Sequence, residues 1–420
     1  MNGSDLSGKR VLVVGLARSG NAAADVLVAH GAGVVAFDRN EAVEAGRLRE
    51  LGVEVHLGRE EEKLLQGIDL VVKSPGVPGE TPLVAGARRR SIPVWSEIEL
   101  GAQLLSNPIL GVTGTNGKTT TSELLGEVFR AAARPVEVAG NVGRPLTSLV
   151  GAVHPDTWIV CELSSFQLED VNTFNPEIGV LLNLEPDHLD RHGSLEAYSD
   201  AKLRLFERQS NDDTAVVPRG FDAVPGAGRR IEFDASDELP AEPRIPGPHN
   251  RENAAAATAA ARAAGIAEDA IAEGLRTFPG VPHRIELVCE LRGVRYVNDS
   301  KATNVAATLR ALASFPGSRL HVILGGRGKA EPYAPLVAAF GSDDRAYLIG
   351  EAAREIRAEL ESSGVPYEDA GDLESALREA SANARAGDVV LLSPACASFD
   401  QFEDFEARGD EFRRLVKALA

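Results

Sequence analysis

Short apolar runs, each ending at glycine or a polar residue, recur along the chain and predict buried strands. Arg10 to Val14 is such a run; a glycine loop, a helical stretch from Asn21 to His30 and a second run from Gly33 to Phe37 follow it. The same order continues to the end of the chain. This alternation is typical of α/β proteins with mostly parallel sheets.

The remaining apolar runs divide the chain into three segments. A chain of 420 residues is too long for one ordinary core. An alanine-rich helix is predicted from Arg251 to Ala264, after a stretch of loops and short strands rich in glycine and proline at 221–248. Further strands are predicted at 69–73, 94–95, 109–112, 158–162, 178–183, 296–298, 320–324, 346–349 and 389–392.

Composition and charge narrow the function classes. The net charge of -18 and the lack of a basic stripe exclude a nucleic-acid-binding protein. Three cysteines without paired spacing fit a reducing compartment. The first ten residues contain no apolar signal region, and no apolar run approaches the roughly 20 residues of a membrane span. We therefore expect a cytoplasmic protein without membrane contact, acting as a monomer.

The strongest motif lies between the strand 109–112 and a helix from Lys118. It reads Gly114-Thr115-Asn116-Gly117-Lys118-Thr119-Thr120. Backbone N–H groups and the helix N-terminus of such loops point at phosphate, Lys118 can bridge the outer phosphates, and the Thr119 hydroxyl can hold Mg²⁺. Five residues rather than four separate Gly111 from Gly117, so the Walker spacing is not strict. The alternative is a glycine-rich turn before a helix.

A second glycine loop follows the first strand. It reads Gly15-Leu16-Ala17-Arg18-Ser19-Gly20 and lacks the middle glycine of the dinucleotide-binding pattern. Asp38, at the end of the next strand, is placed to bind a ribose hydroxyl, and Ser74-Pro75-Gly76 is expected to face the same crevice. The missing glycine argues against a nicotinamide dinucleotide and leaves room for another nucleotide. From this segment alone, a generic α/β turn is equally well supported.

Two further strands end in polar residues near the predicted phosphate loop. Glu162 ends the strand 158–162, where a carboxylate is placed to bind Mg²⁺. His188 follows the strand 178–183 and is a candidate ligand or hydrogen-bonding residue. Lys202 lies 14 residues further on in a predicted helix, and taken by itself it is a surface lysine.

Other polar motifs occur in the last 172 residues of the chain. Three of them follow predicted strands, where α/β folds place ligands, although each alone could be a capped loop. Cys396 could be a nucleophile, but no histidine stands near it in sequence, and a buried small residue fits better. The motifs are His249-Asn250, Pro282-His283-Arg284-Ile285-Glu286, Asn298-Asp299-Ser300-Lys301-Ala302-Thr303-Asn304, Gly325-Gly326-Arg327-Gly328-Lys329 and Ser393-Pro394-Ala395-Cys396-Ala397-Ser398-Phe399-Asp400-Gln401-Phe402.

Together and in this order, the motifs resemble the Mur ligases of bacterial cell-wall synthesis, most closely their D-glutamate-adding members. The phosphate loop marks the wider superfamily, which includes folylpolyglutamate ligases. The motifs that start at Glu162, Asn298 and Ser393 look specific to the D-glutamate-adding members. The resemblance runs from the first glycine loop to Phe405. Arg327 departs from it, because relatives often carry an acidic residue there.

The resemblance implies an α/β protein of three domains. Residues 1–96 would form a Rossmann-like domain for the UDP-carrying substrate, and 97–281 a P-loop ATPase-like domain for ATP. Residues 282–420 would form a Rossmann-like domain for the amino acid. We expect the site to assemble when these domains close.

The resemblance also implies a role for individual residues. Lys118, His188 and Lys202 are expected to be catalytic. Two Mg²⁺ sites are expected, with Lys202 as a carbamate, and their ligands are Thr119, Glu162, His188 and Lys202. The residues implied for ATP are Gly114, Thr115, Asn116, Gly117, Lys118, Thr119, Thr120, Asn250, Arg284 and Asp299. Those implied for the UDP-carrying substrate are Leu16, Ala17, Asp38, Ser74, Pro75, Gly76, Asn141 and His188. Those implied for D-glutamate are Lys301, Thr303, Lys329, Ser398 and Phe405.

The implied reaction joins D-glutamate to UDP-N-acetylmuramoyl-L-alanine, with ATP activating the carboxylate as an acyl phosphate. The nearest alternative is another Mur or folylpolyglutamate-type ligase, which an assay with different amino acids separates. A P-loop kinase would form ADP without an amine acceptor. A Rossmann-type dehydrogenase would need the glycine that is missing near Ala17. A catalytically dead binding protein is disfavoured, because all the motif residues are present.

Overall fold

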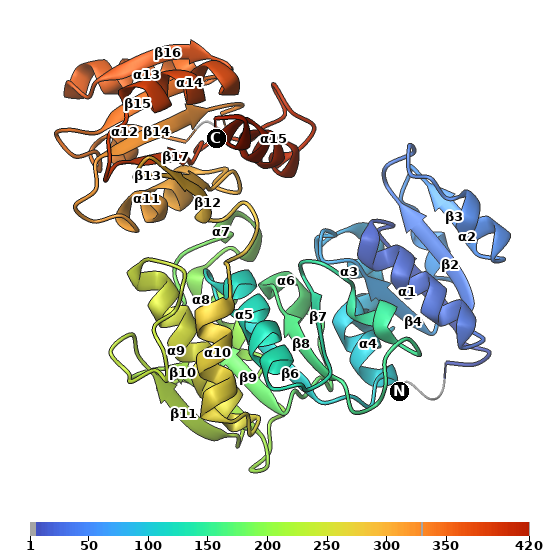
Figure 1. Cartoon of the computed structure of the whole chain (residues 1–420). Helices are drawn as coiled ribbons and strands as arrows, with labels where there is room; N and C mark the ends of the chain where they lie inside the picture. Colours follow the sequence, from blue (N-terminus) through green and yellow to red (C-terminus); the bar gives the residue numbers. More distant parts are fainter. Residues whose placement is uncertain (1–5, 329–330, 420) are drawn as a thin grey trace. The chain divides into compact units, whose positions relative to one another are not determined.

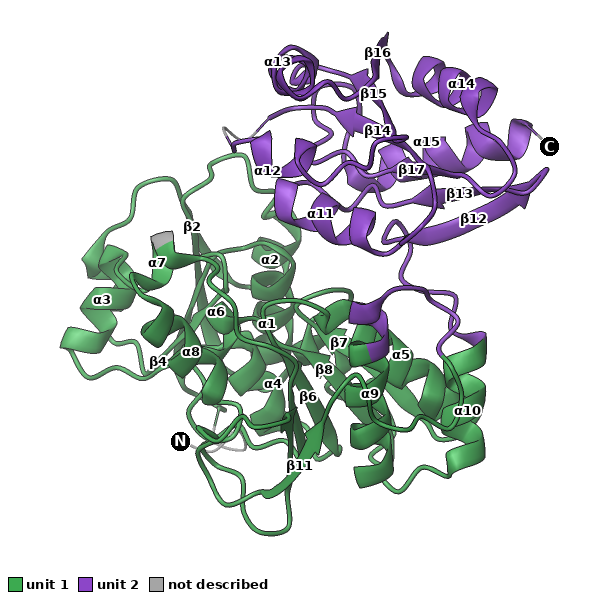
Figure 2. Cartoon of the chain, turned by 90° about the vertical axis from the view of Figure 1, so that its left-hand side faces the viewer, with its two compact units in different colours: residues 1–242, 252–276 green, residues 243–251, 277–420 purple. Residues whose placement is uncertain are grey.

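A computed structural model describes residues 6–328 and 331–419, and of Asp190 it describes the backbone only. Two compact units are present in this part of the chain (Figures 1 and 2). Unit 1 contains the residues up to Glu242 together with Glu252–Arg276, and unit 2 contains Pro243–Arg251 and the residues from Thr277 onward. None of the described helices has the length and hydropathy that a bilayer span requires.

The first sheet of unit 1 has five parallel strands in the order β3-β2-β1-β4-β5. Along β1, Val11 and Val13 pack into one apolar cluster and Leu12 and Val14 into another. Both faces are therefore buried, which explains the continuous apolar run. The strands are β1 (Arg10–Val14), β2 (Gly33–Asp38), β3 (Glu54–Leu57), β4 (Leu70–Lys73) and β5 (Val94–Ser96). The helices around them are α1 (Arg18–Ala29), α2 (Gly46–Glu50), η2 (Glu62–Leu65), α3 (Pro82–Arg89) and α4 (Glu97–Leu104).

The second sheet of unit 1 has six parallel strands in the order β11-β10-β9-β6-β8-β7. β6 lies between β9 and β8, so the loops that leave these three strands emerge side by side. The strands are β6 (Ile109–Thr113), β7 (Val136–Gly140), β8 (Trp158–Glu162), β9 (Ile178–Leu181), β10 (Thr214–Pro218) and β11 (Arg229–Phe233). The helices that follow α4 are α5 (Lys118–Ala131), η3 (Leu146–Leu149), α6 (Ser165–Leu168), α7 (Leu189–His192), α8 (Leu195–Leu203), α9 (Pro248–Ala263) and α10 (Glu268–Thr277).

The sheet of unit 2 has six strands in the order β12-β13-β17-β14-β15-β16; β12 is antiparallel to β13 and the other pairs are parallel. Its two faces carry separate apolar clusters. The strands are β12 (Glu286–Leu291), β13 (Val294–Asn298), β14 (Leu320–Gly325), β15 (Arg345–Ile349), β16 (Tyr367–Gly371) and β17 (Val389–Leu392). The helices are α11 (Val305–Ala313), α12 (Ala334–Val337), α13 (Ala353–Ser363), α14 (Leu373–Asn383) and α15 (Phe405–Ala418).

The α/β fold with mainly parallel sheets is as predicted, and the strands expected at 10–14, 158–162 and 389–392 are confirmed residue for residue. The first helix begins at Arg18 rather than Asn21, and β9 ends at Leu181 rather than Asn183. Five strands had no counterpart in the predictions. Of these, β3, β7, β12 and β16 are sheet edges, where polar residues interrupt the apolar pattern. β10 is the fifth.

Candidate active site

The phosphate loop, residues 114–120, connects β6 to α5 and requires glycine at two positions. Gly114 has φ +151° and Gly117 has φ +84°, both in the region that side chains disfavour. A Cβ on Gly117 would collide with the amide oxygen of Asn253, and a Cβ on Gly114 would lie 2.9 Å from Leu182 Cβ. The strand, loop and helix order predicted for this motif is confirmed.

Two residues of the loop after β9, Asn183 and Glu185, hold the phosphate loop in shape. Asn183 accepts hydrogen bonds from the N–H groups of Thr115 at its carbonyl (3.0 Å) and of Asn116 at its side-chain oxygen (2.9 Å). The Glu185 carboxylate accepts from Asn116 Nδ2 at 2.8 Å. No role was predicted for Asn183 or Glu185, although their place directly after a strand beside the phosphate loop was a usable signal.

Two lysines converge on one carbonyl of the loop. Lys118 Nζ donates to the carbonyls of Gly114 (2.8 Å) and Thr115 (2.9 Å), and Lys202 Nζ donates to the same Gly114 oxygen at 2.8 Å. Lys202 is only 1% exposed, so the surface-lysine alternative is wrong. Burial, with a contribution from the charge of Lys118, lowers the pKa of Lys202 to about 7.

Tyr198 lies one helical turn before Lys202 and covers it. Its hydroxyl donates to Thr115 Oγ1 at 3.0 Å, and Lys202 Nζ lies 4.6 Å from the ring centroid. Burial raises the pKa of Tyr198 to about 12, so the hydroxyl stays a donor. The four-residue spacing on α8 was the signal for this residue, because it places both side chains on one helical face.

Glu162 and Thr119, the residues predicted to bind Mg²⁺, are both buried. Glu162 ends β8, pairs with Val112 of β6 and is 2% exposed, while Thr119, in the first turn of α5, is 8% exposed. Asn141 Nδ2 donates to Glu162 Oε1 at 2.9 Å. A buried carboxylate and a hydroxyl beside a phosphate loop are ligands that Mg²⁺ prefers.

His188 directly precedes α7 and has a left-handed backbone, φ +51°. Its side chain is half exposed, and its ring centroid lies 4.9 Å from that of Phe166. His192 stacks on Phe166, with ring centroids 5.2 Å apart, and meets Tyr198 edge-on at 5.3 Å. Aromatic rings therefore connect His188 to the helix of Lys202.

A pocket of about 420 Å³ lies where the first glycine loop meets the loop after β7. Six of the residues predicted for the UDP-carrying substrate line it: Ala17, Asp38, Ser74, Pro75, Gly76 and Asn141. Leu16 and His188 are not among its lining residues. The Leu16 side chain is buried, and its N–H donates to Asp38 Oδ2 at 2.6 Å.

Arg18 lines the same pocket and had no predicted role. Its Nη1 donates to the carbonyl of Gly143 at 2.6 Å. Among the lining residues it is the only cation, whereas Asp38 is the only anion. Arg18 is the first residue of α1, so its guanidinium lies at the positive end of the helix dipole. The guanidinium and the helix N-terminus both favour an anionic ligand.

In unit 2, polar residues gather after the adjacent strands β13, β17 and β14. Asp299 is 4% exposed; its carboxylate accepts from Ser393 Oγ at 2.7 Å and from Ile285 N at 3.1 Å. Burial raises its pKa to about 7, although the charge of Arg284 acts in the opposite direction. Arg284, predicted for the same nucleotide, therefore lies near Asp299.

The predicted D-glutamate residues are partly brought together in unit 2. Lys301 Nζ lies 5.7 Å from the ring centroid of Phe405, and Ser398 is 2% exposed in the loop after β17. Thr303 is partly buried in the turn that follows Lys301, its N–H bonded to the Lys301 carbonyl at 2.9 Å. Lys329 lies outside the described residues.

Two other residues of unit 2 have local partners. Asn250 Nδ2 donates to the carbonyl of Pro246 at 2.6 Å. Arg327, the residue that departs from the family pattern, pairs with Glu351 through two hydrogen bonds of 3.1 and 3.2 Å. An exposed ion pair between Arg327 and Glu351 is therefore found at this position.

Comparison with known proteins covers almost the whole chain. The N-terminal domain of the MurD-like Mur ligases matches residues 9–96, the Mur ligase middle domain 112–224 and the Mur ligase glutamate ligase domain 283–396. A UDP-N-acetylmuramoylalanine–D-glutamate ligase of Anaeromyxobacter dehalogenans is 46% identical over 100% of both chains. One of Sphingopyxis alaskensis is 44% identical over 98% of both.

Solved structures share the fold at low identity. The MurF ligase of Thermotoga maritima, determined in complex with ADP, has a TM-score of 0.60 and 17% identity, covering 100% of this chain and 97% of that one. The UDP-N-acetylmuramate-alanine ligase MurC of the same organism has a TM-score of 0.59 and 19% identity, covering 98% and 100%.

Proposed function

This chain belongs to the Mur ligase family, and on that premise we propose that it joins D-glutamate to UDP-N-acetylmuramoyl-L-alanine, with cleavage of ATP to ADP and phosphate. It is a ligase of peptidoglycan precursor synthesis. The observation that carries the proposal is the phosphate loop, whose Gly114 carbonyl holds both Lys118 and the buried Lys202. The chain is 46% identical to a D-glutamate ligase over its whole length, so the kinase and dehydrogenase alternatives are no longer supported.

We assign the donor substrate to the pocket lined by the first glycine loop. Asp38 is fixed by the Leu16 N–H, and its carboxylate suits the hydroxyls or imide of a uridine nucleotide. Arg18 and the N-terminal end of α1 suit a diphosphate. We propose that Asn141, in the wall of this pocket, contacts the sugar portion of the donor.

The chemistry begins when the donor carboxylate attacks the γ-phosphorus of ATP and ADP leaves. Lys118 and the loop N–H groups neutralise charge that builds on the phosphates in this step. Mg²⁺, when bound at Thr119 and Glu162 and at a second site with His188 and a carbamylated Lys202, supplies further charge neutralisation. The amine of D-glutamate then attacks the acyl carbon, and phosphate leaves.

The amino acid is assigned to unit 2. Ser398 and Lys301 suit the two carboxylates of D-glutamate, because a hydroxyl and an ammonium both donate to carboxylate oxygens. Phe405 lies against Lys301, and we assign Thr303 to the same pocket. The assignment of Lys329 rests on its sequence motif. The three-domain division, the monomeric state and the cytoplasmic location stay predictions.

One assay tests the proposal: phosphate release with ATP and UDP-N-acetylmuramoyl-L-alanine, comparing D-glutamate, L-glutamate, L-alanine and no amine. We expect release with D-glutamate only. Lys118→Ala should abolish it in a folded protein, since the loop loses its phosphate-binding ammonium. Equal turnover with L-alanine, or near-normal turnover of Lys118→Ala, would contradict the assignment.

A further inference from the structure

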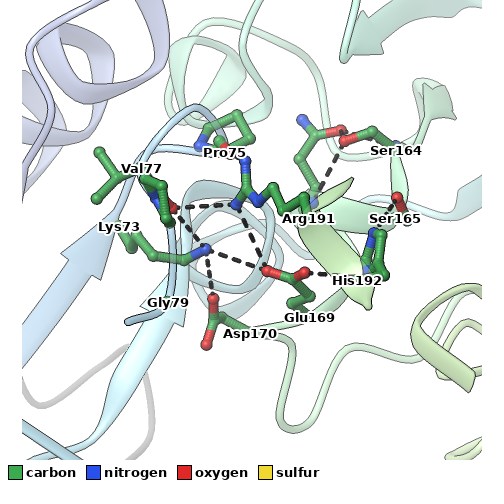
Figure 3. A network of polar contacts seen from close by, with 12 residues as sticks. Lys73, Pro75, Val77, Gly79, Ser164, Ser165, Glu169, Asp170, Arg191 and His192 are labelled. Carbon is green, nitrogen blue, oxygen red and sulfur yellow. Dashed lines mark hydrogen bonds and ion pairs between the residues drawn. The ribbon is translucent and has the colours of Figure 1, made fainter. Parts of the chain in front are cut away.

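Arg191 crosses between two segments of unit 1 that are far apart in sequence. It lies in α7, three residues after His188. Its Nη1 donates to the carbonyl of Pro75 at 2.8 Å, and its Nη2 donates to the carbonyl of Val77 at 3.1 Å (Figure 3). The guanidinium thus holds two carbonyls of the loop that follows β4.

Two further contacts hold the guanidinium. Its carbon lies 3.8 Å from the ring centroid of Phe166, and Nη2 lies 3.6 Å from Glu169 Oε2. The Arg191 side chain is 15% exposed. Because a planar guanidinium can fork onto two acceptors while stacking on a ring, these contacts fix both its position and its orientation.

A buried lysine also donates a hydrogen bond to this loop. Lys73 is fully buried at the end of β4; its Nζ lies 2.9 Å from Asp170 Oδ2 and donates to the Val77 carbonyl at 3.2 Å. Figure 3 shows Lys73 and Arg191 both directed at Val77, and both also approach Glu169 Oε2, at 3.4 and 3.6 Å. The Val77 carbonyl therefore accepts from two cationic groups, which gives this loop little freedom to shift.

The two segments joined by Arg191 serve different parts of the proposed reaction. Pro75 and Val77 line the pocket assigned to the donor nucleotide. His188 and Phe166 lie on the other side, and Phe166 connects through His192 and Tyr198 to Thr115 of the phosphate loop. Arg191 thus contacts both the pocket wall, at Pro75 and Val77, and the ring of Phe166.

We propose that Arg191 is a positioning residue that fixes the 74–77 loop relative to His188, and so presents the donor carboxylate to the phosphate loop. The inference rests on the proposed function, because it needs a donor that reaches from the pocket to the site of phosphoryl transfer. A displacement of about 1 Å at such a site can lower turnover about 100-fold. Binding of the nucleotide itself needs only the pocket.

This separation of binding from turnover is the test. For Arg191→Ala we expect kcat to fall about 10- to 100-fold, while the Kd for UDP, measured by calorimetry, changes less than about threefold. Arg191→Lys keeps one donor and should retain more activity, with kcat lowered about 3- to 10-fold. If the alanine variant does not fold, the lysine variant carries the same comparison.

Arg204 provides the matched control. It also forks onto two carbonyls, those of Glu169 and Val171, both at 2.6 Å, and both acceptors lie outside the 74–77 loop. Arg204→Ala should lower Tm about as much as Arg191→Ala and keep kcat within about threefold of wild type. Equal losses of kcat in both alanine variants would overturn the proposal and make Arg191 a structural brace.

Two other results would also overturn it. Wild-type kcat in Arg191→Ala removes the positioning role, and a loss of UDP affinity in step with kcat makes Arg191 a support of the pocket alone. Failure of the proposed function is distinguishable, since wild type itself would then release no phosphate with D-glutamate and the donor.

Discussion

Asn141 is bound twice to Glu162: its backbone N–H donates to the Glu162 carbonyl and its side-chain Nδ2 to Glu162 Oε1, both at 2.9 Å. The two residues were assigned to different ligands, Asn141 to the sugar substrate and Glu162 to Mg²⁺. Their contact means that Asn141 also orients the carboxylate proposed to bind the cation. Such outer partners of a metal ligand commonly affect metal affinity by about 10- to 100-fold.

Asn141→Ala should therefore change the response to Mg²⁺. We expect the Mg²⁺ concentration for half-maximal phosphate release to rise about 10-fold, because Glu162 loses its side-chain partner. Asn107→Ala is the control: Asn107 donates to three backbone carbonyls, including Thr157 at 2.9 Å, and is assigned to neither the sugar substrate nor Mg²⁺. An unchanged Mg²⁺ response with a raised donor KM would assign Asn141 to the substrate alone.

Lys202 should work as a carbamate. Its buried amine has a pKa lowered to about 7, so above that pH it is mainly neutral, the form that adds CO₂. A carbamate would supply the oxygen ligand that Mg²⁺ prefers. We expect wild-type turnover at pH 8 to fall when bicarbonate is removed and to recover when it is restored.

Lys202→Arg separates this explanation from a simple need for positive charge. The guanidinium stays cationic and cannot form a carbamate, so we expect turnover to be nearly abolished with or without bicarbonate. Retention of most activity would mean that the second cation site is built around His188 and other ligands.

Glu97 should make stability depend on pH. Its Oε1 accepts from the N–H (2.6 Å) and hydroxyl (2.7 Å) of Thr147, but the residue is 1% exposed, and burial raises its pKa from 4.5 to about 7. Between these values the folded state keeps a proton that the unfolded state has released. The contribution of Glu97 to stability therefore falls as pH rises through this window.

Glu97→Gln should remove this dependence, because the amide stays neutral. We expect the variant to be more stable than wild type at pH 8, by at most about 3 kcal/mol, and nearly equal to it at pH 4. The measurement is the difference in the free energy of unfolding in urea between the two proteins at several pH values. A difference that does not change between pH 5 and 8 would show that Glu97 is ionised in both states.

Ser398→Ala should weaken D-glutamate selectively. Loss of a hydroxyl that donates to a carboxylate costs about 1.5 kcal/mol or more, so we expect KM for D-glutamate to rise about 10-fold. KM for ATP should stay within about twofold. Ser381→Ala, which loses only a hydrogen bond to the Leu377 carbonyl, is the control. A rise confined to KM for ATP would move Ser398 out of the amino-acid pocket.

The parts of the site that the sequence predicted share one geometric cause. Parallel strands deliver their C-terminal loops to one edge, so a polar motif after an apolar run can be placed without knowing the full topology. The phosphate loop, Glu162 and Asp299 were placed at strand ends in this way, and the structure has them there. The order β9-β6-β8 then explains why Asn183 reaches the phosphate loop.

Other features depend on contacts that leave no local pattern. The sequence around Lys202 does not mark its amine as buried, because the acceptor of its hydrogen bond, the Gly114 carbonyl, lies 88 residues away. The same holds for Arg191, whose acceptors in the 74–77 loop are more than 110 residues away. Charged residues in short helices are predicted to lie at the surface, unless the packing of distant segments is known.

The burial of Lys73 limits how this protein can be divided. Its counter-ions, Glu169 and Asp170, lie beyond residue 96, where the first domain was predicted to end. A fragment cut there would lose both carboxylates that pair with the Lys73 ammonium. The fragment would also lack the pocket wall from Gly140 to Pro145. A chimera that exchanges N-terminal segments between relatives therefore has to carry both sides of this ion pair together.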